Sequence, residues 1–260
     1  MKYQRIYKFL FFLSLAGILF LSVQAFTVDE PLISEQTYLY KTTFVRAAPG
    51  RLLDLIDLLK ERMEWFDAVG DGRPFWWRHT QGDQWDLMMI YPMGSYADFY
   101  SKNRINRRNK ARSGALSPEE FQANFHACVS WYEDLFVWGP PLEVVKDVFK
   151  DTSFYHCEIF IALPGKRAEL FKEREMENAY LDGIGRRQNL IFTKDQGASW
   201  DLFTLGCYKD MDEWAASSGV SREKREESAV KAGFKGADHI GPTMRTLILM
   251  HRDTIGVAIR

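Results

Sequence analysis

The sequence predicts an α+β fold in which two tandem β-α-β-β-α-β repeats pack sheet to sheet as an intramolecular barrel. The first observation is an internal repeat: residues 81–87 (QGDQWDL) return as residues 196–202 (QGASWDL), 115 positions later, with five of seven residues identical. The second is that the Pro-Gly pair at 49–50 recurs at 164–165, at the same offset. Self-similarity at a fixed offset is the mark of a repeat architecture.

The first half alternates between strand and helix periodicity. Residues 37–46 are rich in β-branched and aromatic side chains and predict a strand, and residues 51–66 place apolar side chains at helical spacing. Ser117, Pro118 and Glu120 form the start signal of a further helix. The remaining elements expected here are strands 75–80, 85–91 and 135–138 and helices 95–110 and 117–132.

The second half repeats this order, so the chain divides into two domains. Its expected strands are 154–162, 190–193, 200–207 and 245–250, with helices at 166–181 and from 210 onward. The predicted organisation is therefore a signal peptide (1–25), a leader (26–36), a first repeat (37–141), a linker (142–152) and a second repeat (153–260).

The N-terminus has the pattern of a targeting segment. Basic residues precede an apolar run at 9–23, and a small-residue site ends at Ala25. We expect export to the periplasm or the exterior, with no membrane attachment after cleavage. The alternative is an uncleaved anchor, since residues 9–25 are at the lower limit for a span.

Composition argues against a nucleic-acid partner. The net charge is −1, and the basic run at 102–112 is expected to be a solvated helix face; an anionic surface or partner is the other interpretation.

The chain has three cysteines, Cys128, Cys157 and Cys207, so at least one thiol is unpaired. If a disulfide formed, it would join Cys157 to Cys207. Cysteines on neighbouring strands rarely have the geometry that a disulfide needs, so free buried thiols are expected.

A four-stranded sheet with helices on one face leaves its other face bare, and two copies in one chain can cover each other. The β-α-β-β-α-β order is ferredoxin-like. With Pro-Gly before each first helix, Gly70 and Gly185 after it, and Trp at the start of each third strand, the chain resembles the dimeric α+β barrel superfamily in tandem form, with NIPSNAP-like and antibiotic-biosynthesis-monooxygenase-like domains.

That resemblance covers about residues 37–138 and 154–251. It implies a range of activities: cofactor-independent oxygenases, haem enzymes and small-molecule binding proteins. Haem is therefore a possible cofactor, although the cofactor is otherwise unknown. Because the halves can pair internally, we expect a monomer with an internal pseudo-dimer.

The repeated aromatic residues are candidate ligand contacts. Trp85 and Trp200 each precede an aspartate, and Tyr40 and Tyr155 occupy matched places on the first strand of each half. One interpretation is an aromatic ligand wall. The other interpretation is structural: Trp fills the edge of the core and Asp forms hydrogen bonds that stabilise the preceding turn. The duplication favours this interpretation, because both halves share the same shape.

His126 and His239 occupy matched places before the last strand of each half. They are expected either to cap helix ends or to face the pocket between sheet and helices as a haem ligand or proton donor.

His156 and Glu158 lie two residues apart and so share one strand face. The first half has Lys41 and Thr43 at these positions, so the pair departs from the repeat. If it is catalytic, His156 is the base and Glu158 its orienter; the alternative is a polar contact between the halves.

No metal site is predicted, since no Cys-x-x-Cys, His-x-x-x-His or EF-hand pattern occurs. The leading hypothesis is an exported protein that binds a small apolar or aromatic molecule. The alternatives are a cofactor-independent or haem-linked oxygenase-type enzyme, and a structural or partner-binding protein.

Overall fold

The computed structural model describes residues 36–111 and 116–259, so the expected signal peptide and all but the last residue of the leader lie outside the described chain. The strands are β1 (Tyr38–Ala47), β2 (Phe75–Gln81), β3 (Leu87–Gly94), β4 (Val129–Gly139), β5 (Phe154–Ala162), β6 (Leu190–Gly197), β7 (Leu202–Tyr208) and β8 (Ile248–Ala258). The α-helices are α2 (Leu52–Ala68), α3 (Tyr96–Phe99), α4 (Lys102–Lys110), α5 (Pro118–Cys128), α6 (Leu142–Phe149), α7 (Arg167–Gly183), α8 (Met211–Ala215), α9 (Arg222–Lys231) and α10 (Ile240–Arg245), with 3-10 turns η1 (Ala216–Gly219) and η2 (Ala237–His239).

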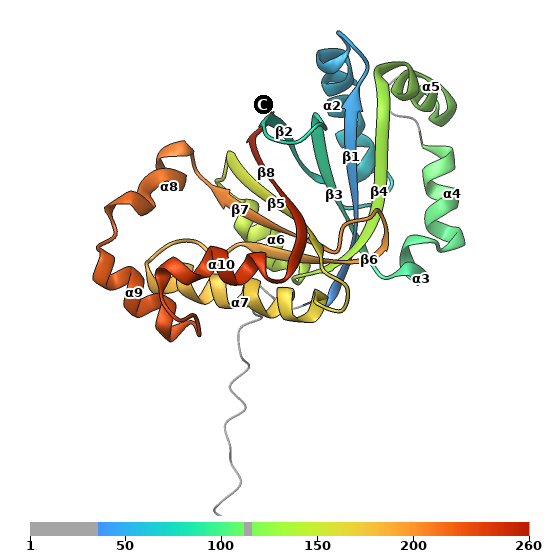
Figure 1. The fold of residues 1–260 in the computed structure, drawn as a ribbon. Helices are drawn as coiled ribbons and strands as arrows, with labels where there is room; N and C mark the ends of the chain where they lie inside the picture. Colours follow the sequence, from blue (N-terminus) through green and yellow to red (C-terminus); the bar gives the residue numbers. More distant parts are fainter. Residues whose placement is uncertain (1–35, 112–115, 260) are drawn as a thin grey trace, which may run out of the picture. The chain divides into compact units, whose positions relative to one another are not determined.

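The strands form one closed antiparallel barrel in the order β1-β3-β2-β8-β5-β7-β6-β4 (Figure 1). Each half contributes four neighbouring strands, β4-β1-β3-β2 and β8-β5-β7-β6. The halves meet edge to edge: β2 pairs with β8 and β4 pairs with β6. Closure leaves no unpaired strand edge between the halves, which a flat sheet would expose.

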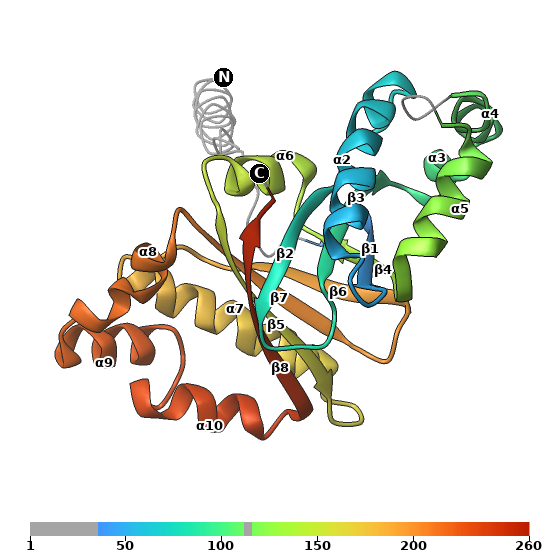
Figure 2. The ribbon, with the colours of Figure 1, turned by 90° about the horizontal axis from the view of Figure 1, so that it is seen from above.

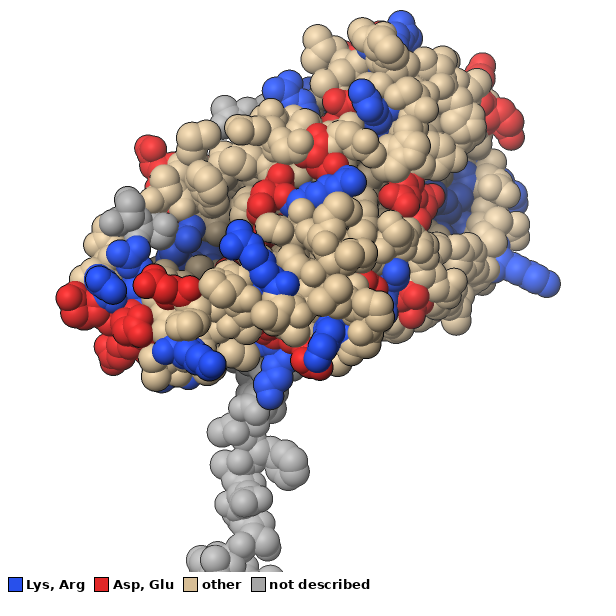
Figure 3. All heavy atoms as spheres, in the orientation of Figure 1, with Lys and Arg blue, Asp and Glu red and all other residues tan. Residues whose placement is uncertain are grey.

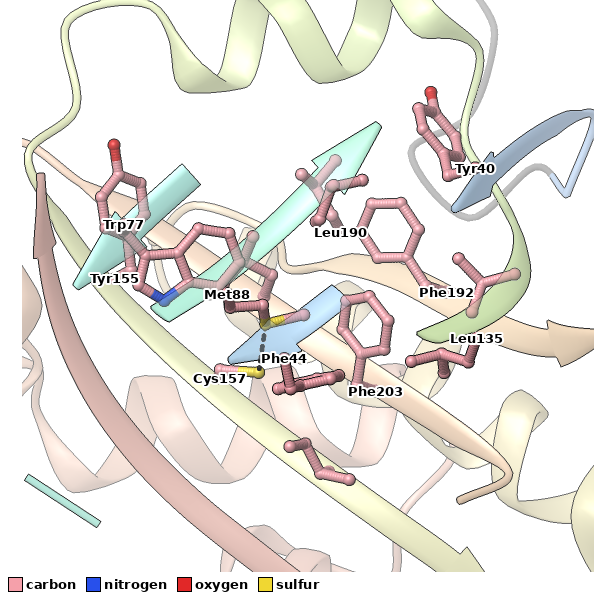
Figure 4. Packing of buried hydrophobic residues seen from close by; sticks show 14 of the residues in the cluster. Tyr40, Phe44, Trp77, Met88, Leu135, Tyr155, Cys157, Leu190, Phe192 and Phe203 are labelled. Atoms are coloured by element: carbon pink, nitrogen blue, oxygen red, sulfur yellow. Dashed lines mark hydrogen bonds between the residues drawn. The ribbon is translucent and has the colours of Figure 1, made fainter. Parts of the chain in front are cut away.

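The barrel interior is a packed apolar core. Along β5, Tyr155, Cys157 and Ile159 belong to this core, so His156 and Glu158 point to the outer face. The core side chains come from both halves and interdigitate, as Figure 4 shows for Tyr40, Phe192, Phe203, Trp77 and Tyr155.

Phe44 joins the two repeated tryptophans inside this core. Its ring centre lies 5.3 Å from that of Trp85 and 4.4 Å from that of Trp200, both in edge-to-face geometry. Each buried aromatic ring of this kind contributes about 1.5–3 kcal/mol to stability. The two repeated Trp residues therefore lie in one shared core.

Helices cover the outer face of the barrel. Figures 1 and 2 place α2 and α5 beside the β1, β3 and β4 strands, and α7 and α10 beside the strands of the second half, with α9 packed against α7. The segment expected to be a linker carries α6, whose Val145 is buried in the barrel core. Phe149 at its end stacks on Tyr155, with ring centres 5.4 Å apart.

Several expected element boundaries were wrong, and three of them differ most in what they change. The helix expected over 95–110 is two helices, because the Ser101 side chain accepts the backbone N–H of Arg104 and starts α4. The helix from 117 ends at Cys128, and β4 begins there because its residues pair with β1 over its whole length. The last strand covers 248–258 rather than 245–250, since it pairs with β5 as far as Val257.

The repeated turn has the same backbone contacts in both halves. The Asp86 carboxylate accepts the backbone N–H of Ala47 at 2.8 Å, and the Asp201 carboxylate accepts that of Ala162 at 2.9 Å. Gly197 adopts a positive φ of 102°, and a Cβ there would lie 2.7 Å from the backbone oxygen of Asp134. Glycine is therefore required where the turn passes the neighbouring strand.

Candidate functional site

One cavity lies between the outer face of the first-half sheet and the helices that cover it. It has a volume of about 360 Å³ and is here named the α2–α5 cavity. Side chains of β1, β3 and β4 line one side, and residues of α2, α4 and α5 line the other. Much of its lining is aromatic, including Trp65, Phe66, Tyr91, Phe99, Phe121 and Phe125.

Helical and strand periodicity put these residues in one place. On α2, Leu59, Trp65 and Phe66 are buried against the sheet and α5. On β1, the residues on either side of Thr42 point outward, so Lys41 and Thr43 reach the cavity while Phe44 enters the barrel core. The cavity is thus built where the apolar stripe of a helix faces the outer side of the sheet.

Arg62 enters this aromatic lining from α2. Its guanidinium carbon lies 3.3 Å from the centre of the Trp65 ring and 4.3 Å from that of Phe121. Its Nη1 atom is buried and has no hydrogen-bond partner among the described residues. Burial, helped by the nearby charge of Arg108, lowers the pKa of Arg62 to about 10. Arg62 is therefore a partly desolvated cation that pairs with no carboxylate of the described residues.

The other charges of the cavity are paired, and cations outnumber anions. Arg104 contacts both carboxylate oxygens of Asp71 at 2.8–2.9 Å, and Arg108 contacts the same carboxylate. Lys41 pairs with Asp134 at 2.8 Å. Four cations (Lys41, Arg62, Arg104 and Arg108) thus stand against two carboxylates (Asp71 and Asp134). The cavity favours an anion.

This result changes the interpretation of the basic run at 102–112. Its residues were expected to form a solvated helix face, but Arg104 and Arg108 turn toward Asp71 and line the cavity. Over the face of the molecule drawn in Figure 3, by contrast, positive and negative side chains are interspersed.

A second group of polar residues lies on the outer face of the second-half sheet. His156 and Glu158 on β5 lie beside His251 and Asp253 on β8, and we name these four residues the His156 cluster. His156 Nε2 is 3.3 Å from Asp253 Oδ1, and His251 Nε2 is 2.9 Å from Asp253 Oδ2. Burial opposes a charge on His156, but the hydrogen bond to Asp253 and neighbouring carboxylates outweigh it and raise its pKa.

Helix α7 adds a buried arginine and two further carboxylates next to this cluster. Arg174 is only 2% exposed and pairs with Glu173 and Glu177. It also lies 3.8 Å from Glu158. Burial raises the pKa of Glu177 to about 7 against the opposing effect of Arg174. A pocket of about 290 Å³, lined in part by His156, Glu158 and Glu177, opens here.

The predicted pair His156 and Glu158 therefore lies at a pocket. Glu158 accepts a hydrogen bond from Thr204 Oγ1 at 3.0 Å. Tyr40, Tyr155, Trp85 and Trp200 lie instead in the barrel core, each at most 7% exposed, so the structure gives these four residues a packing role.

The structure does not bring His126 and His239 to either pocket lining. His126, at the end of α5, is 2.7 Å from the side chain of Gln122 and stacks beside Tyr132. His239 ends the η2 turn, and its carbonyl oxygen accepts the Thr243 hydroxyl.

Sequence reasoning missed Arg62, His251 and Asp253. Arg62 lies between apolar positions of α2, so its place in the sequence indicates the polar, solvent-facing side of an amphipathic helix. Only the packing of α5 against α2 shows that Arg62 faces a cavity. His251 and Asp253 lie beyond the expected end of the last strand. The β-branched residues Thr254, Ile255 and Val257 were the signal that the strand continues past residue 250.

Among the described residues, neither of the two pockets offers a histidine or cysteine that is free to ligate haem. Haem needs an axial nitrogen, sulfur or phenolate ligand facing an apolar slot. The described lining of the α2–α5 cavity holds no histidine or cysteine; its other potential donors are the Met89 sulfur and the Tyr91 and Tyr132 hydroxyls, and the Tyr91 hydroxyl contacts Met89 Sδ at 3.1 Å. The second-half pocket has His156, which pairs with Asp253, and the carboxylates of Glu158 and Glu177 line the same pocket.

Among residues 36–111 and 116–259, no helix combines the length and the apolar character needed to cross a membrane. No protein-family model matches the chain, and no curated protein matches its sequence.

Comparison with solved structures shows the fold. An anthrone oxidase-like protein matches with a TM-score of 0.54 and 10% identity, over 89% of this chain and 95% of that one. A presumed monooxygenase from Lactobacillus acidophilus NCFM matches with a TM-score of 0.50 and 6% identity, over 85% and 96%. A protein described as a presumed chlorite dismutase reaches 0.49 with 13% identity, over 86% and 96%. The chain therefore shares its α+β barrel fold with the anthrone oxidase-like protein and the presumed monooxygenase.

Proposed function

We propose that this chain is an exported protein that binds a small aromatic acid in the α2–α5 cavity. The observation that carries the proposal is Arg62, whose buried Nη1 has no partner among the described residues and whose guanidinium lies between the rings of Trp65 and Phe121. A bound carboxylate or phenolate would supply the missing acceptor.

The energetic argument rests on desolvation. Burying a cation without a partner anion lowers the stability of the folded protein. The pKa of Arg62 is lowered because burial disfavours its charged form. An arginine beside a carboxylate forms strong charge-assisted hydrogen bonds. An acidic ligand would therefore turn an unfavourable feature of the free protein into binding energy.

The aromatic part of the ligand follows from the lining and size of the cavity. A volume of about 360 Å³ is at the small end of the range of roughly 300–1,000 Å³ typical of ligand sites. The rings of Phe66, Phe121 and Phe125 offer apolar surface for stacking. A ligand of one or two fused rings with one acidic group matches this combination.

Isothermal titration with matched probes tests the proposal. We expect 1-naphthoate to bind at least about tenfold more tightly than 1-naphthylmethanol, which has the same rings but no charge. Arg62→Met should remove that difference, and Arg222→Met, at an exposed arginine of α9, should preserve it. Equal binding of both probes to the wild-type chain would overturn the proposal.

Oxygen uptake during the same titration separates binding from turnover. The fold is shared with monooxygenase-like proteins, so an oxygenase acting on the bound aromatic acid is the second candidate. Oxygen consumption that depends on the ligand and is lost in Arg62→Met would select it.

We also propose that the halves are copies of one β-α-β-β-α-β unit and that the chain is a monomer whose halves form an internal pseudo-dimer. The matched contacts of Asp86 with Ala47 and of Asp201 with Ala162 support the repeat. Closure of the barrel within one chain supports the monomer. Sedimentation as a tight dimer would contradict the second statement.

A further inference from the structure

The His156 cluster brings nitrogen and oxygen donors from two neighbouring strands to one point. In the β5–β8 register, Glu158 lies opposite Asp253. His251 precedes Asp253 by two residues on the same face of β8 and lies opposite Phe160. One ligand atom each from Glu158, His251 and Asp253 can be chosen so that all lie within 4.8 Å of one another.

The spacing matches the edges of a coordination shell. Two donors that each lie about 2.1 Å from a metal ion are about 3.0 Å apart in octahedral and about 3.4 Å apart in tetrahedral geometry. His251 Nε2 is 2.9 Å from Asp253 Oδ2, and His156 Nε2 is 3.3 Å from Asp253 Oδ1. Small rotations of these side chains would converge them on one ion.

The carboxylates near the His156 cluster outnumber the cationic side chains, so a bound cation would improve the charge balance. Glu158, Glu173 and Glu177 surround the guanidinium of Arg174, and Asp253 lies beside His156 and His251. Arg174 pairs with Glu173 and Glu177, so it neutralises the more distant Glu158 only in part. A carboxylate that is largely buried is paired, protonated or bound to metal, and the Glu158 side chain is only 13% exposed.

The cluster is also reachable from solvent. The Asp253 side chain is 54% exposed, and that of His251 is 23% exposed. The pocket lined by His156 and Glu158 opens on the same face. An ion can therefore enter without unfolding the barrel.

We propose that Glu158, His251 and Asp253 bind a divalent first-row transition-metal ion, with His156 as a fourth donor or as the residue that orients Asp253. Imidazole together with carboxylate selects ions such as Zn²⁺ over Mg²⁺ or Ca²⁺, which prefer oxygen donors alone. The sequence had predicted no metal site, because its donors come from two strands 93 residues apart and form no local motif.

Zinc titration of the untagged, chelator-treated chain tests the site. We expect about one Zn²⁺ per chain by titration calorimetry and elemental analysis, and no displacement by an equal concentration of Mg²⁺. His251→Gln and Asp253→Asn should each weaken Zn²⁺ binding at least about tenfold. His239→Gln, at the exposed histidine of η2, is the matched control and should bind as the wild type does.

Near-UV circular dichroism of each variant shows whether it keeps the native fold, and Co²⁺ loading gives a second readout through its visible absorption. Less than about a tenth of an equivalent of bound Zn²⁺ would overturn the proposal. So would stoichiometric binding that survives both substitutions in folded protein. Arg62→Met should retain Zn²⁺, because this site is independent of the α2–α5 cavity.

Discussion

The Arg62 guanidinium carbon lies 3.3 Å from the centre of the Trp65 ring, three residues further along α2. This cation–π contact holds the charge at the wall of the α2–α5 cavity, where Nη1 has no hydrogen-bond partner among the described residues. Residues that serve binding commonly cost stability in the free protein.

Arg62→Met should therefore separate stability from binding. Because burial lowers the pKa of Arg62, its charge costs stability at pH 7; allowing for partial exposure and the lost cation–π contact, the variant should be more stable by up to about 1 kcal/mol. Binding of 1-naphthoate should weaken about tenfold to a hundredfold. Urea unfolding and calorimetry measure the two effects, and a variant that loses both stability and binding would point to a structural role instead.

The pH dependence of binding should follow the Arg62 guanidinium. The lowered pKa means that Arg62 is charged below about pH 10 and loses its proton above it. The affinity for 1-naphthoate should be flat between pH 6 and about 9 and fall as pH rises through about 10, because the bound anion favours the charged guanidinium over the neutral one. Affinity of the Arg62→Met chain should not show this fall; the same slope in both proteins would assign it to another group.

Phe44→Ala should destabilise both halves together. Phe44 belongs to the first half but packs against Trp200 of the second half as well as Trp85. Its removal should lower the free energy of unfolding by about 3–5 kcal/mol and leave a single transition. Two separate transitions in thermal or urea unfolding would show that the halves are independent units.

The two repeated aspartates should contribute similarly to stability. Asp86→Ala and Asp201→Ala each remove the acceptor of a backbone N–H on the neighbouring strand, so each should cost about 1.5–2 kcal/mol. Asparagine keeps one acceptor oxygen, and the corresponding Asn variants should lose less than half of that. A large cost in one half alone would show that the two turns are not equivalent.

The thiols should be unreactive in the native protein. Cys157 and Cys207 are free, at most 1% exposed, and burial raises the pKa of both. Cys128 is 4% exposed and lies 3.6 Å from Arg51, at the outer end of α5. Iodoacetamide followed by peptide mass analysis should label Cys128 first and the other two only in denaturant; early labelling of Cys157 would contradict the packed core.

Local periodicity accounts for the part of the fold that the sequence predicted. The alternation of Tyr155, Cys157 and Ile159 with His156 and Glu158 correctly separated the core face of β5 from its outer face. Free buried thiols were also confirmed. These features depend on residues close together in the chain.

The rest depends on contacts between distant segments. Arg62 becomes a candidate ligand contact only because α5 brings Phe121 over it. Asp253 joins Glu158 only because β8 continues beyond residue 250, the expected end of the strand. Trp85 and Trp200, repeated and aromatic, suggested a ligand wall, but closure of the barrel places them in its interior.

The most direct test of the central claim is a crystal structure of the chain with 1-naphthoate. The account predicts that the rings lie in the α2–α5 cavity beside Trp65 and Phe121, with a carboxylate oxygen within about 3.2 Å of an Arg62 nitrogen. A ligand bound elsewhere, or bound in the cavity with its carboxylate directed away from Arg62, would contradict it.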